Sequence, residues 1–484
     1  MDLSILRDQA ESNVCEFLSE PGSGLVFLRG RRRVGKSSLL KKIAASNSRC
    51  FYFSGALDEP AKKLLIRFAR AWDEYAKNDD FKRIAPNQLD WEFIFHKIAS
   101  YSSKSNKPIV LMLDEIQWLA QTGTGFVGLL KNAWLDFEKT KNMKVILCGS
   151  SNKFFVDNVG GEEKILRGMI SRSDIWLYPL SPVEVKTYYG RNLSFDENIF
   201  LYMISGGIPY YLNQFNFQYG FIRGVNDAVF CERTIFLSEA DEVLNIDFQN
   251  RGLPAIKSIF QSFKKRYSTI ETIKKNTRMA ASTLSDAIHK LERYSLLFEL
   301  SDFTEKVKTK KRNSFFYYKD FFLFFYFKVL HKYSKQIKEN TDQNIFSIIL
   351  STNKSLFIDQ FTGIAFENFV QHCLETLPLT NPLFKEFSLK DRNFIFFDSR
   401  SEVDLAIKHS TEENIRWIEC KWTQNYERIK EGIEQLKKIN ESKEFYPRQI
   451  KFLVTNYKFS EKQKADAFDK HQIHLVSIHK IFEK

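Results

Sequence analysis

A glycine-rich segment, placed between an apolar run and a helical stretch, constrains the fold of this chain more than any other feature. The apolar run Leu25 to Leu28 leads into Gly30-Arg31-Arg32-Arg33-Val34-Gly35-Lys36-Ser37, and Ser38 to Ala45 has helical character. The spacing Gly-x4-Gly-Lys-Ser, with a strand before it and a helix after it, is that of a phosphate-binding P-loop. Small residues let backbone N–H groups surround phosphates at the positive end of the helix dipole.

An acidic pair in a second segment completes this phosphate chemistry. The apolar run Ile109 to Leu113 ends in Asp114-Glu115. We expect Lys36 to neutralise the β- and γ-phosphates, Ser37 and Asp114 to hold Mg²⁺, and Glu115 to polarise the attacking water. The alternative is a chance glycine turn beside a surface acidic pair, but it does not explain why both halves occur in order and in context. ATP and Mg²⁺ are therefore the expected cofactors.

Apolar runs and helical segments alternate through the first third of the chain. A third run, Val145 to Cys148, is followed by Gly149-Ser150-Ser151, and residues 1–20 have apolar positions at helical spacing. Strands that alternate with helices imply a parallel sheet covered on both faces. We predict an α/β fold, a P-loop NTPase core over residues 1–185.

The remainder of the chain predicts four further parts. Residues 186–250 are expected to form a helical lid, 251–320 a winged helix, 321–355 a helical connector and 356–484 an α/β domain with the order helix, strands, helix, strand. The winged helix-turn-helix prediction rests on three helical pieces and two strand-like runs, with Ser282 as the expected N-cap of the recognition helix. The pieces are Ala255–Lys265, Ile270–Lys275, Ser282–Tyr294, Leu296–Leu300 and Phe315–Tyr318.

Positive charge is concentrated in the predicted winged helix and connector. The formal net charge of the chain is +13, and residues 251–340 hold 20 Lys and Arg against 8 acidic residues. Such a segment is typical of a polyanion partner, so we expect DNA, bound mainly through phosphates and weakened by salt. A solvated helical face or a protein-contact module is the alternative. The expected contacts are Ser282, Thr283, Ser285, Asp286, His289, Lys290 and Arg293 on the recognition helix, and Lys306, Lys308, Lys310, Lys311 and Arg312 at the wing tip.

Composition excludes several other classes of protein. Residues 1–10 lack a basic start followed by an apolar core, and the apolar stretch Phe321 to Phe327 is far shorter than the roughly 20 residues that a membrane-spanning helix needs. The six cysteines are scattered without a CxxC pair, which argues against a disulfide framework and a structural zinc site. We expect a cytoplasmic protein with no membrane partner.

The first 330 residues resemble the archaeal-type P-loop ATPases of the AAA+ and signal-transduction ATPase group. The resemblance rests on the P-loop Gly30 to Leu39, on Leu113 to Leu119, on Cys148 to Ser151 and on Gly206-Gly207-Ile208-Pro209-Tyr210, with Arg7-Asp8-x-x-Glu11 and Arg167 to Pro182 as further matches. It implies that Ser150 senses the γ-phosphate, that Pro209 belongs to a lid segment over the nucleotide, and that Arg172 acts as an arginine finger. It also implies that homo-oligomers complete the site. The implied nucleotide-binding residues are Gly30, Arg31, Arg32, Arg33, Val34, Gly35, Lys36, Ser37, Ser38, Asp114, Ser150 and Pro209.

The C-terminal part carries a second candidate site. Glu402-Val403-Asp404 and Glu419-Cys420-Lys421 lie on two predicted strands, and pairing of these strands as a hairpin would bring Asp404, Glu419 and Lys421 together. Two carboxylates can hold Mg²⁺, the lysine can orient a water, and Glu367 from the preceding helix could add a ligand. Residues 356–455 thus resemble the PD-(D/E)xK nucleases, with Val403 in place of the proline that names the motif. A catalytically silent domain with strand-edge charges is the alternative.

These features together predict an ATPase with two further modules. In the first hypothesis the ATP cycle controls a DNA-binding winged helix and a Mg²⁺-dependent nuclease-like domain, in DNA processing or defence. In the second, ATP drives a regulatory switch or scaffold whose nuclease-like domain is inactive. The catalytic residues expected from the first hypothesis are Lys36, Glu115, Arg172, Asp404, Glu419 and Lys421, and the expected metal ligands are Ser37, Asp114, Glu367, Asp404 and Glu419.

Overall fold

The computed structural model places most of the chain in two compact units. The first comprises Met1–Pro179 with Ile208–Tyr210, and the second comprises Leu180–Gly207 with Tyr211–Lys484. The residues that the structure describes are 8–120, 123, 125–158, 166, 169–170, 172, 174–300, 315–339, 344–352, 357, 361–376, 393–394, 403–408, 414–439 and 448–481.

The first unit is built on a five-stranded sheet in the order β2-β3-β4-β1-β5. All neighbouring strands are parallel, which confirms the predicted parallel sheet. The runs predicted at Ile109 to Leu113 and Val145 to Cys148 are strands, whereas β2 and the two-residue β5 were not predicted. The strands are β1 (Gly24–Arg29), β2 (Cys50–Ser54), β3 (Ile109–Asp114), β4 (Met143–Gly149) and β5 (Ile175–Trp176).

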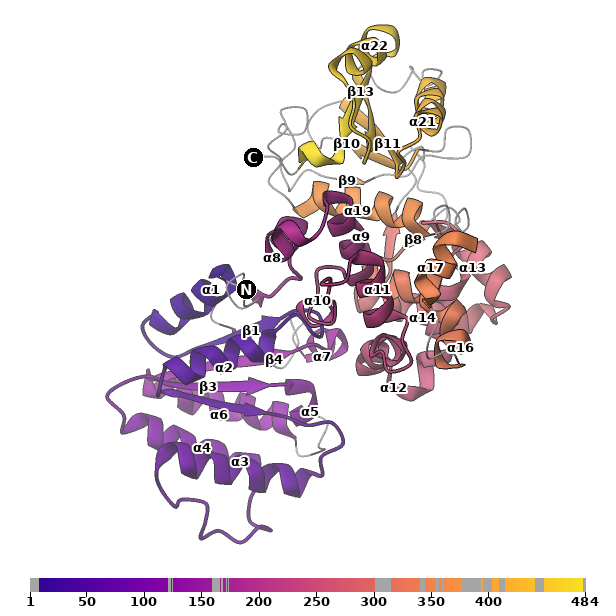
Figure 1. The fold of residues 1–484 in the computed structure, drawn as a ribbon. Coiled ribbons are helices and arrows are strands. Elements are labelled where there is room, and N and C mark those ends of the chain that lie inside the picture. The colour runs from indigo at the N-terminus through magenta and orange to yellow at the C-terminus, as the bar shows by residue number, and fades with distance from the viewer. Residues whose placement is uncertain are drawn as a thin grey trace. The chain divides into compact units, whose positions relative to one another are not determined.

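Helices cover both faces of this sheet, and successive strand residues alternate between two apolar cores. Phe27 packs with the cluster that contains Trp91 and Phe137, whereas its neighbours Val26 and Leu28 pack with the cluster formed with α1 and α2. Figure 1 shows α1 and α2 on one face and α3, α4 and α6 on the other. The helices are α1 (Asp8–Ser19), α2 (Lys36–Ser46), α3 (Ala61–Ala76), α4 (Trp91–Ser103), α5 (Ile116–Ala120), α6 (Phe126–Thr140) and α7 (Asn152–Asn158).

The second unit begins with the predicted helical region. Two of its helices start at capping boxes, Ser181 with Glu184 and Ser194 with Glu197. The helix expected to begin at Ala255, after Pro254, instead belongs to a continuous 27-residue helix that contains this proline and ends at Ser262. Buried apolar side chains on both sides of Pro254 anchor this helix. The helices are α8 (Pro182–Tyr189), α9 (Phe195–Ser205), α10 (Pro209–Leu212), α11 (Phe221–Val229) and α12 (Phe236–Ser262), and α8 is followed by a 3-10 turn, η3 (Gly190–Asn192).

Residues 263–317 combine helices with a small antiparallel sheet in the order β6-β8-β7. Helices and strands lie close to their predicted places, but β6 was missed because it has two residues. Ser282 is not the N-cap of the recognition helix, since the helix begins at Ala281 after Ala280, which has no side-chain hydrogen-bond acceptor. The wing tip, with its five basic residues, lies outside the described part of the chain. The elements are β6 (Ser268–Thr269), α13 (Ile270–Thr277), α14 (Ala281–Arg293), β7 (Phe298–Leu300) and β8 (Phe315–Tyr317).

The aromatic stretch after β8 is a buried helical connector, as predicted. Each residue from Phe321 to Phe327 is buried, because the stretch packs among the aromatic side chains of α9, α10 and α12. Its second half is a π-helix. The elements are α15 (Phe321–Phe325), η5 (Tyr326–Leu330), α16 (His331–Glu339) and α17 (Ile345–Thr352).

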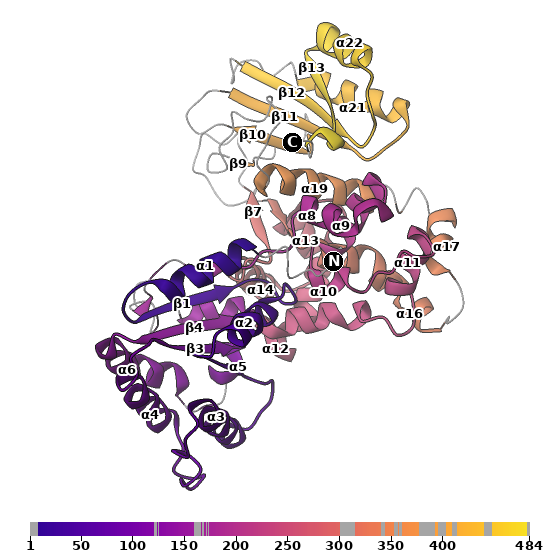
Figure 2. The ribbon, with the colours of Figure 1, turned by 60° about the vertical axis from the view of Figure 1, so that its left-hand side comes forward.

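The C-terminal part forms a mixed five-stranded sheet in the order β13-β12-β11-β10-β9. Strand β11 is antiparallel to β10 and parallel to β12. Side chains of α21 and α22 share an apolar core with Ile415 and Trp417 of β11, and α19 also packs on β11; Figure 2 shows α21 and α22 on the side away from α19. The elements are α19 (Gly363–Thr376), β9 (Asn393–Phe394), β10 (Leu405–Lys408), β11 (Asn414–Lys421), α21 (Tyr426–Lys438), β12 (Arg448–Thr455), α22 (Glu461–His471), β13 (Ile473–Ser477) and η8 (Ile478–Ile481).

Within the described ranges, no helix combines the length and the apolar character that crossing a membrane requires.

Candidate functional site

The loop between β1 and α2 has a backbone that two glycines make possible. Gly30 and Gly35 have φ angles of 154° and 99°. A Cβ atom at Gly30 would lie 2.2 Å from the carbonyl oxygen of Leu177, which follows β5, so no other residue fits there. Gly35 lies at the N-cap of α2 and offers no side chain to its N–H groups. The first N–H groups of α2 are therefore available to an anion.

Lys36 is held inside this loop. Its side chain is 5% exposed, and its ammonium donates hydrogen bonds to the carbonyl oxygens of Gly30 at 2.8 Å and Arg31 at 3.0 Å. Burial lowers the pKa of Lys36, while Cys148, Glu115 and Asp114 act in the opposite direction. The positive charge is thus fixed at the centre of the loop rather than free in solvent.

The other predicted loop residues differ in what they present. Val34 is fully buried in the apolar core beside α2, so only its backbone faces the loop. Arg31, Arg32, Arg33 and Ser37 are half-buried, and Ser38 is exposed. Arg33 is a non-glycine residue at a φ of 72°, a conformation that usually requires support from its surroundings. Its guanidinium lies 4.1 Å from the ring centroid of Tyr210.

Asp114 lies at the end of β3 and is held by two donors. The Tyr52 hydroxyl donates to Oδ2 at 2.8 Å, and the Glu115 backbone N–H donates to Oδ1 at 2.9 Å. Burial and the Asp114 carboxylate raise the pKa of Tyr52, so this hydroxyl keeps its proton. Tyr52 was not predicted, because its approach depends on the pairing of β2 with β3 and not on a local motif.

Glu115 has a strained backbone and two partners for its carboxylate. Its φ of 49° is in the left-handed region, where a non-glycine residue is costly. Gln117 donates its amide N–H to Glu115 Oε2, and Ser150 Oγ lies 3.5 Å from the same oxygen. The structure thus brings the predicted residues Glu115 and Ser150 together. Gln117, which sequence reasoning missed, could have been found from its position two residues after Glu115.

The two residues predicted for the edges of this site lie on different elements. Pro209 begins α10, and the segment Ile208–Tyr210 belongs to the first unit, where Tyr210 contacts Arg33. Arg172 instead pairs with Glu16 of α1 at 3.4 Å and with Glu20, the residue that follows this helix, at 3.0 Å. These ion pairs hold the Arg172 guanidinium against α1.

Helix α14 has one exposed polar face and one buried apolar face. The seven predicted contact residues are all exposed, and the apolar positions between them are buried. The exposed residues are Ser282, Thr283, Ser285, Asp286, His289, Lys290 and Arg293.

In the C-terminal sheet, the predicted strands pair as a hairpin. Leu405 pairs with Ile418 in the antiparallel register of β10 and β11, so Asp404 comes beside the end of β11. The Cys420 backbone N–H donates to Asp404 Oδ2 at 2.7 Å, and Lys421 Nζ lies 2.6 Å from Glu419 Oε1. The structure therefore brings Asp404, Glu419 and Lys421 together. Glu402 lies outside the described residues.

This cluster has an excess of acidic groups, of which Glu419 is buried and Asp404 and Glu367 are half-buried. Glu419 is 1% exposed, and burial together with Asp404 raises its pKa to about 8. Burial and Asp404 also raise the pKa of Glu367 on α19. Burial alone would lower the pKa of Lys421, but Glu419 and Asp404 raise it above its usual value. The carboxylates therefore repel one another and favour an added positive charge.

A metal ion fits the chemistry of this cluster but not its present geometry. Glu419 Oε2 is buried and has no hydrogen-bond partner within the described part of the chain. Carboxylate oxygens are suitable ligands for Mg²⁺. Among the described residues, however, no three His, Cys, Asp or Glu side chains are arranged so that they could hold a metal ion. Glu419 is paired with Lys421 instead.

The neighbouring segment Arg266-Tyr267 also reaches this cluster, which sequence reasoning did not foresee. Arg266 Nη1 donates to the Asp404 carbonyl oxygen at 2.9 Å, and the Tyr267 hydroxyl donates to the same oxygen at 3.2 Å. The two segments are 138 positions apart in the chain, so no local pattern could signal the contact.

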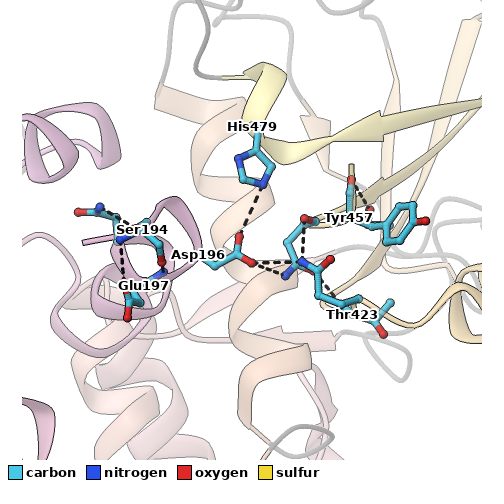
Figure 3. Close-up of polar contacts among 10 residues, drawn as sticks. Ser194, Asp196, Glu197, Thr423, Tyr457 and His479 are labelled. Carbon is cyan, nitrogen blue, oxygen red and sulfur yellow. Dashed lines mark hydrogen bonds and ion pairs between the residues drawn. The ribbon is translucent and has the colours of Figure 1, made fainter. Parts of the chain in front are cut away.

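A further cluster of polar contacts joins Asp196 of α9 to residues that follow three strands of the C-terminal sheet (Figure 3). Asp196 Oδ2 accepts hydrogen bonds from Asn456 Nδ2 at 3.1 Å and Gln424 Nε2 at 3.2 Å, and His479 Nε2 lies 3.6 Å from Oδ1. The Phe195 ring lies 4.0 Å from the His479 ring, centroid to centroid. Asp196 is the second residue of α9 and lies between Ser194 and Glu197, the two residues of the capping box at the start of this helix.

Comparison with known proteins identifies the fold of the first unit. Residues 20–154 match the family described as AAA domain, and residues 326–433 match a family described as archaeal and bacterial proteins of unknown function. A Walker-type ATPase of Pyrococcus abyssi is 17% identical over 67% of this chain and 95% of that chain, with a TM-score of 0.52. The ORC2 protein of Aeropyrum pernix, in ADPNP–ADP complexes, is 10% identical over 73% of this chain and 94% of that chain, with a TM-score of 0.41. No curated protein matches the sequence.

The match of residues 20–154 to the AAA domain family and the fold likeness to the Pyrococcus abyssi protein agree with the geometry of the loop and the sheet. Residues 20–154, which match the AAA domain family, contain the P-loop sequence and four of the five strands of a parallel sheet, and both features were predicted from the sequence.

Proposed function

We propose that the first unit binds ATP at the loop between β1 and α2 and hydrolyses it. The N–H groups at the start of α2 and the buried Lys36 ammonium would hold the phosphates, with Gly30 to Ser38 as the surrounding loop. Catalysis then depends on positioning and charge neutralisation, because phosphoryl transfer requires little covalent chemistry from the protein.

The residues around this loop fit Mg²⁺. The Ser37 hydroxyl and the buried Asp114 carboxylate would hold the ion, and both offer the oxygen ligands that it prefers. When bound, Mg²⁺ would neutralise charge on the phosphates. Tyr52 fixes the Asp114 carboxylate in one orientation. Glu115, restrained by Gln117 and Ser150, would orient the attacking water, and its link to Ser150 would transmit the presence of a γ-phosphate.

Pro209 and Arg172 have separate proposed roles. The contact between Arg33 and Tyr210 supports a role for the Pro209 segment beside the nucleotide. Arg172 would serve as an arginine finger only if its pairs with Glu16 and Glu20 open, for example in a homo-oligomer. The oligomer is part of this proposal.

We propose that residues 251–320 form a winged helix that binds DNA. The exposed polar face of α14 and the excess of 12 positive charges over residues 251–340 support this function. Binding through phosphates should weaken steeply as salt is raised, which would distinguish DNA from a protein partner.

We propose that the C-terminal sheet is a nuclease-like domain that cuts DNA with Mg²⁺. Asp404 and Glu419 would hold the metal, with Glu367 as a further ligand, and Lys421 would stabilise charge on a phosphate or orient a water. Convergence of Asp404, Glu419 and Lys421 carries this proposal. The bound metal would supply a polarised water.

The contacts of Asp196 suggest how the ATP cycle reaches that domain. Asp196 belongs to the region proposed as the lid, and it bonds two segments of the C-terminal sheet directly. A shift of α9 would therefore pull on the ends of β11 and β12. We propose this as the link between ATP and DNA processing or defence.

A second function, an ATP-dependent switch with a silent nuclease-like domain, is favoured by one observation. The described residues hold no ready metal-binding group, and the Glu419 carboxylate is bound to Lys421. In that case ATP would control DNA occupancy or assembly, and the C-terminal domain would act as a scaffold.

A plasmid-cleavage assay separates the two functions. Wild type, Lys36→Ala and Asp404→Ala are compared with and without ATP and Mg²⁺. If the nuclease proposal is correct, wild type cleaves the plasmid and Asp404→Ala does not. Lys36→Ala still cleaves the plasmid, but its cleavage no longer depends on ATP. Absence of cleavage in every nucleotide state, with DNA affinity still altered by Lys36→Ala, would establish the switch instead. ATP binding and turnover of wild type, measured in parallel, test the ATPase assignment by itself.

A further inference from the structure

The segment Arg266-Tyr267 connects α12 to β6 and lies against the proposed metal site. Both side chains donate to the Asp404 carbonyl oxygen, at 2.9 and 3.2 Å. Arg266 Nε also donates to Asn368 Oδ1 at 2.8 Å, and Asn368 is the residue after Glu367. The guanidinium is thus tied to the segments that supply Asp404 and Glu367, which are two of the three chain segments that contribute acidic residues to the site.

Arg266 brings a permanent positive charge to a place that favours cations. Its side chain is 4% exposed, and a guanidinium cannot lose its proton in a protein. Glu367, Asp404 and Glu419 are the acidic residues of the cluster, and Lys421 contributes a positive charge to it. Arg266 therefore supplies charge compensation that an inorganic cation would otherwise provide.

The arrangement is compact but incompletely bonded. Arg266 Nη2 and Glu419 Oε2 are both buried, and neither has a hydrogen-bond partner among the residues that the structure describes. A buried polar group without a hydrogen-bond partner is destabilising. Opening would let water accept a hydrogen bond from Arg266 Nη2 and would let water or a metal ion bind Glu419 Oε2, which offsets part of the cost of breaking the closed arrangement.

We propose that Arg266-Tyr267 is an autoinhibitory plug: the guanidinium, held against the Asp404 carbonyl oxygen and Asn368, competes with a divalent cation for the carboxylate site, and DNA bound on α14 draws the plug away. The idea rests on the proposed nuclease function of the same site. It explains why the acidic residues converge without forming a metal-binding group within the described part of the chain. It also links the proposed winged helix to the nuclease-like domain, because Arg266-Tyr267 leads directly into β6 and β6 is followed at once by α13.

Binding of Mn²⁺ to the full-length chain, without nucleotide or DNA, tests the plug. Calorimetric titrations compare wild type with Arg266→Gln and Asn368→Ala, each also with Asp404→Ala added, so that only the Asp404-dependent site is counted. Arg266→Gln should raise Mn²⁺ affinity about tenfold or more, because it removes a competing charge. Asn368→Ala keeps the charge but removes the tether at Nε, and should raise the affinity by a smaller factor of about three.

Asn368→Ala separates a plug from a simple electrostatic neighbour. A neighbour would leave Mn²⁺ affinity unchanged in this variant, and that result would overturn the proposal, as would equal or weaker binding by Arg266→Gln. Thr376→Ala, an exposed change at the end of the same helix, is the control and should have no effect. Should Arg266→Gln fail to fold by circular dichroism, Asn368→Ala alone decides. If no variant and no DNA complex binds Mn²⁺ through Asp404, the nuclease proposal itself is wrong, and the plug is wrong with it.

Discussion

The loop that carries Lys36 and the cluster around Asp404 are built in opposite ways. The loop is contiguous in sequence, its shape comes from glycine backbone conformations, and its central charge bonds to carbonyl oxygens of the same loop. The cluster is assembled from segments up to 138 positions apart, and its geometry depends on strand pairing and on α19. The geometry of a local site depends on a few backbone positions, whereas the geometry of an assembled site also depends on the elements that pack against it.

Gly30→Ala should have the largest effect on stability and ATP binding, because Gly30 is the position in the loop where a side chain is least tolerated. The new Cβ atom would lie 2.2 Å from a backbone oxygen of Leu177, which cannot move without disturbing β5. We expect a loss of about 3 kcal/mol or more in the stability of the ATPase domain, together with loss of ATP binding.

The matched control is Gly22→Ala. Gly22 also has a positive φ, 79°, but a Cβ atom there meets no described neighbour within 4 Å. Its cost should be that of the backbone conformation alone, about 1–2 kcal/mol. Calorimetric unfolding and ATP titration measure both variants. Equal effects of the two substitutions would mean that the approach of Leu177 does not shape the loop.

The same contrast explains what could be predicted from the sequence. Contiguous residues signal the loop that carries Lys36, the acidic pair Asp114-Glu115 and the buried strands β3 and β4. These elements of the ATPase core could therefore be predicted. Tyr52 was missed because it reaches Asp114 only through the pairing of two strands, and Arg266 because it reaches Asp404 only through tertiary packing. The continuous helix through Pro254 was missed because buried side chains override the local preference of proline.

Tyr52→Phe should have an intermediate effect and tests whether the local site also depends on a remote strand. The change removes the 2.8 Å hydrogen bond to Asp114 and keeps the ring. A hydrogen bond to a charged group contributes about 1.5–3 kcal/mol, so we expect roughly a tenfold loss or more in ATP turnover, with a higher Mg²⁺ requirement. Phosphate release at several Mg²⁺ concentrations provides the measurement. Unchanged ATP turnover at every Mg²⁺ concentration would show that the role of Asp114 does not depend on its hydrogen bond from Tyr52 of β2.

Asp196→Ala should have a smaller effect and tests whether the assembled site responds to α9. The change removes two hydrogen bonds to the C-terminal sheet and leaves the loop untouched. We expect normal basal ATP turnover and about a two- to fivefold loss of the ATP effect on DNA cleavage or DNA affinity. Glu197→Ala, which alters the adjacent capping box instead, should lower stability but not the ATP effect. An ATP effect that survives Asp196→Ala intact would exclude this route of coupling.

A pair of glycine substitutions in helices should give the smallest change and still distinguishes the two regions. Gly128 of α6 has open space where a Cβ atom would be, whereas a Cβ atom at Gly432 of α21 would lie 2.8 Å from Leu453 Cδ1 and 3.4 Å from Lys421 Cγ. Replacement by alanine inside a helix gains up to about 1 kcal/mol. At Gly128 this gain should appear in full. At Gly432 it is opposed by overpacking, which typically costs about 1–3 kcal/mol, although the nearest atom is the flexible end of a leucine.

The expected net loss at Gly432 is therefore about 0–2 kcal/mol by thermal unfolding. The more informative measurement is Asp404-dependent Mn²⁺ binding by Gly432→Ala, because the added methyl group displaces Leu453 and contacts the apolar parts of the Lys421 and Glu419 side chains rather than their charged groups. If the site is assembled from several segments, this shift should alter Mn²⁺ binding. The change in the free energy of Mn²⁺ binding should then exceed the change in the free energy of unfolding. If Gly432→Ala gains stability as Gly128→Ala does and leaves Mn²⁺ binding unaltered, the cluster is as self-contained as the loop, and the distinction between the two sites fails.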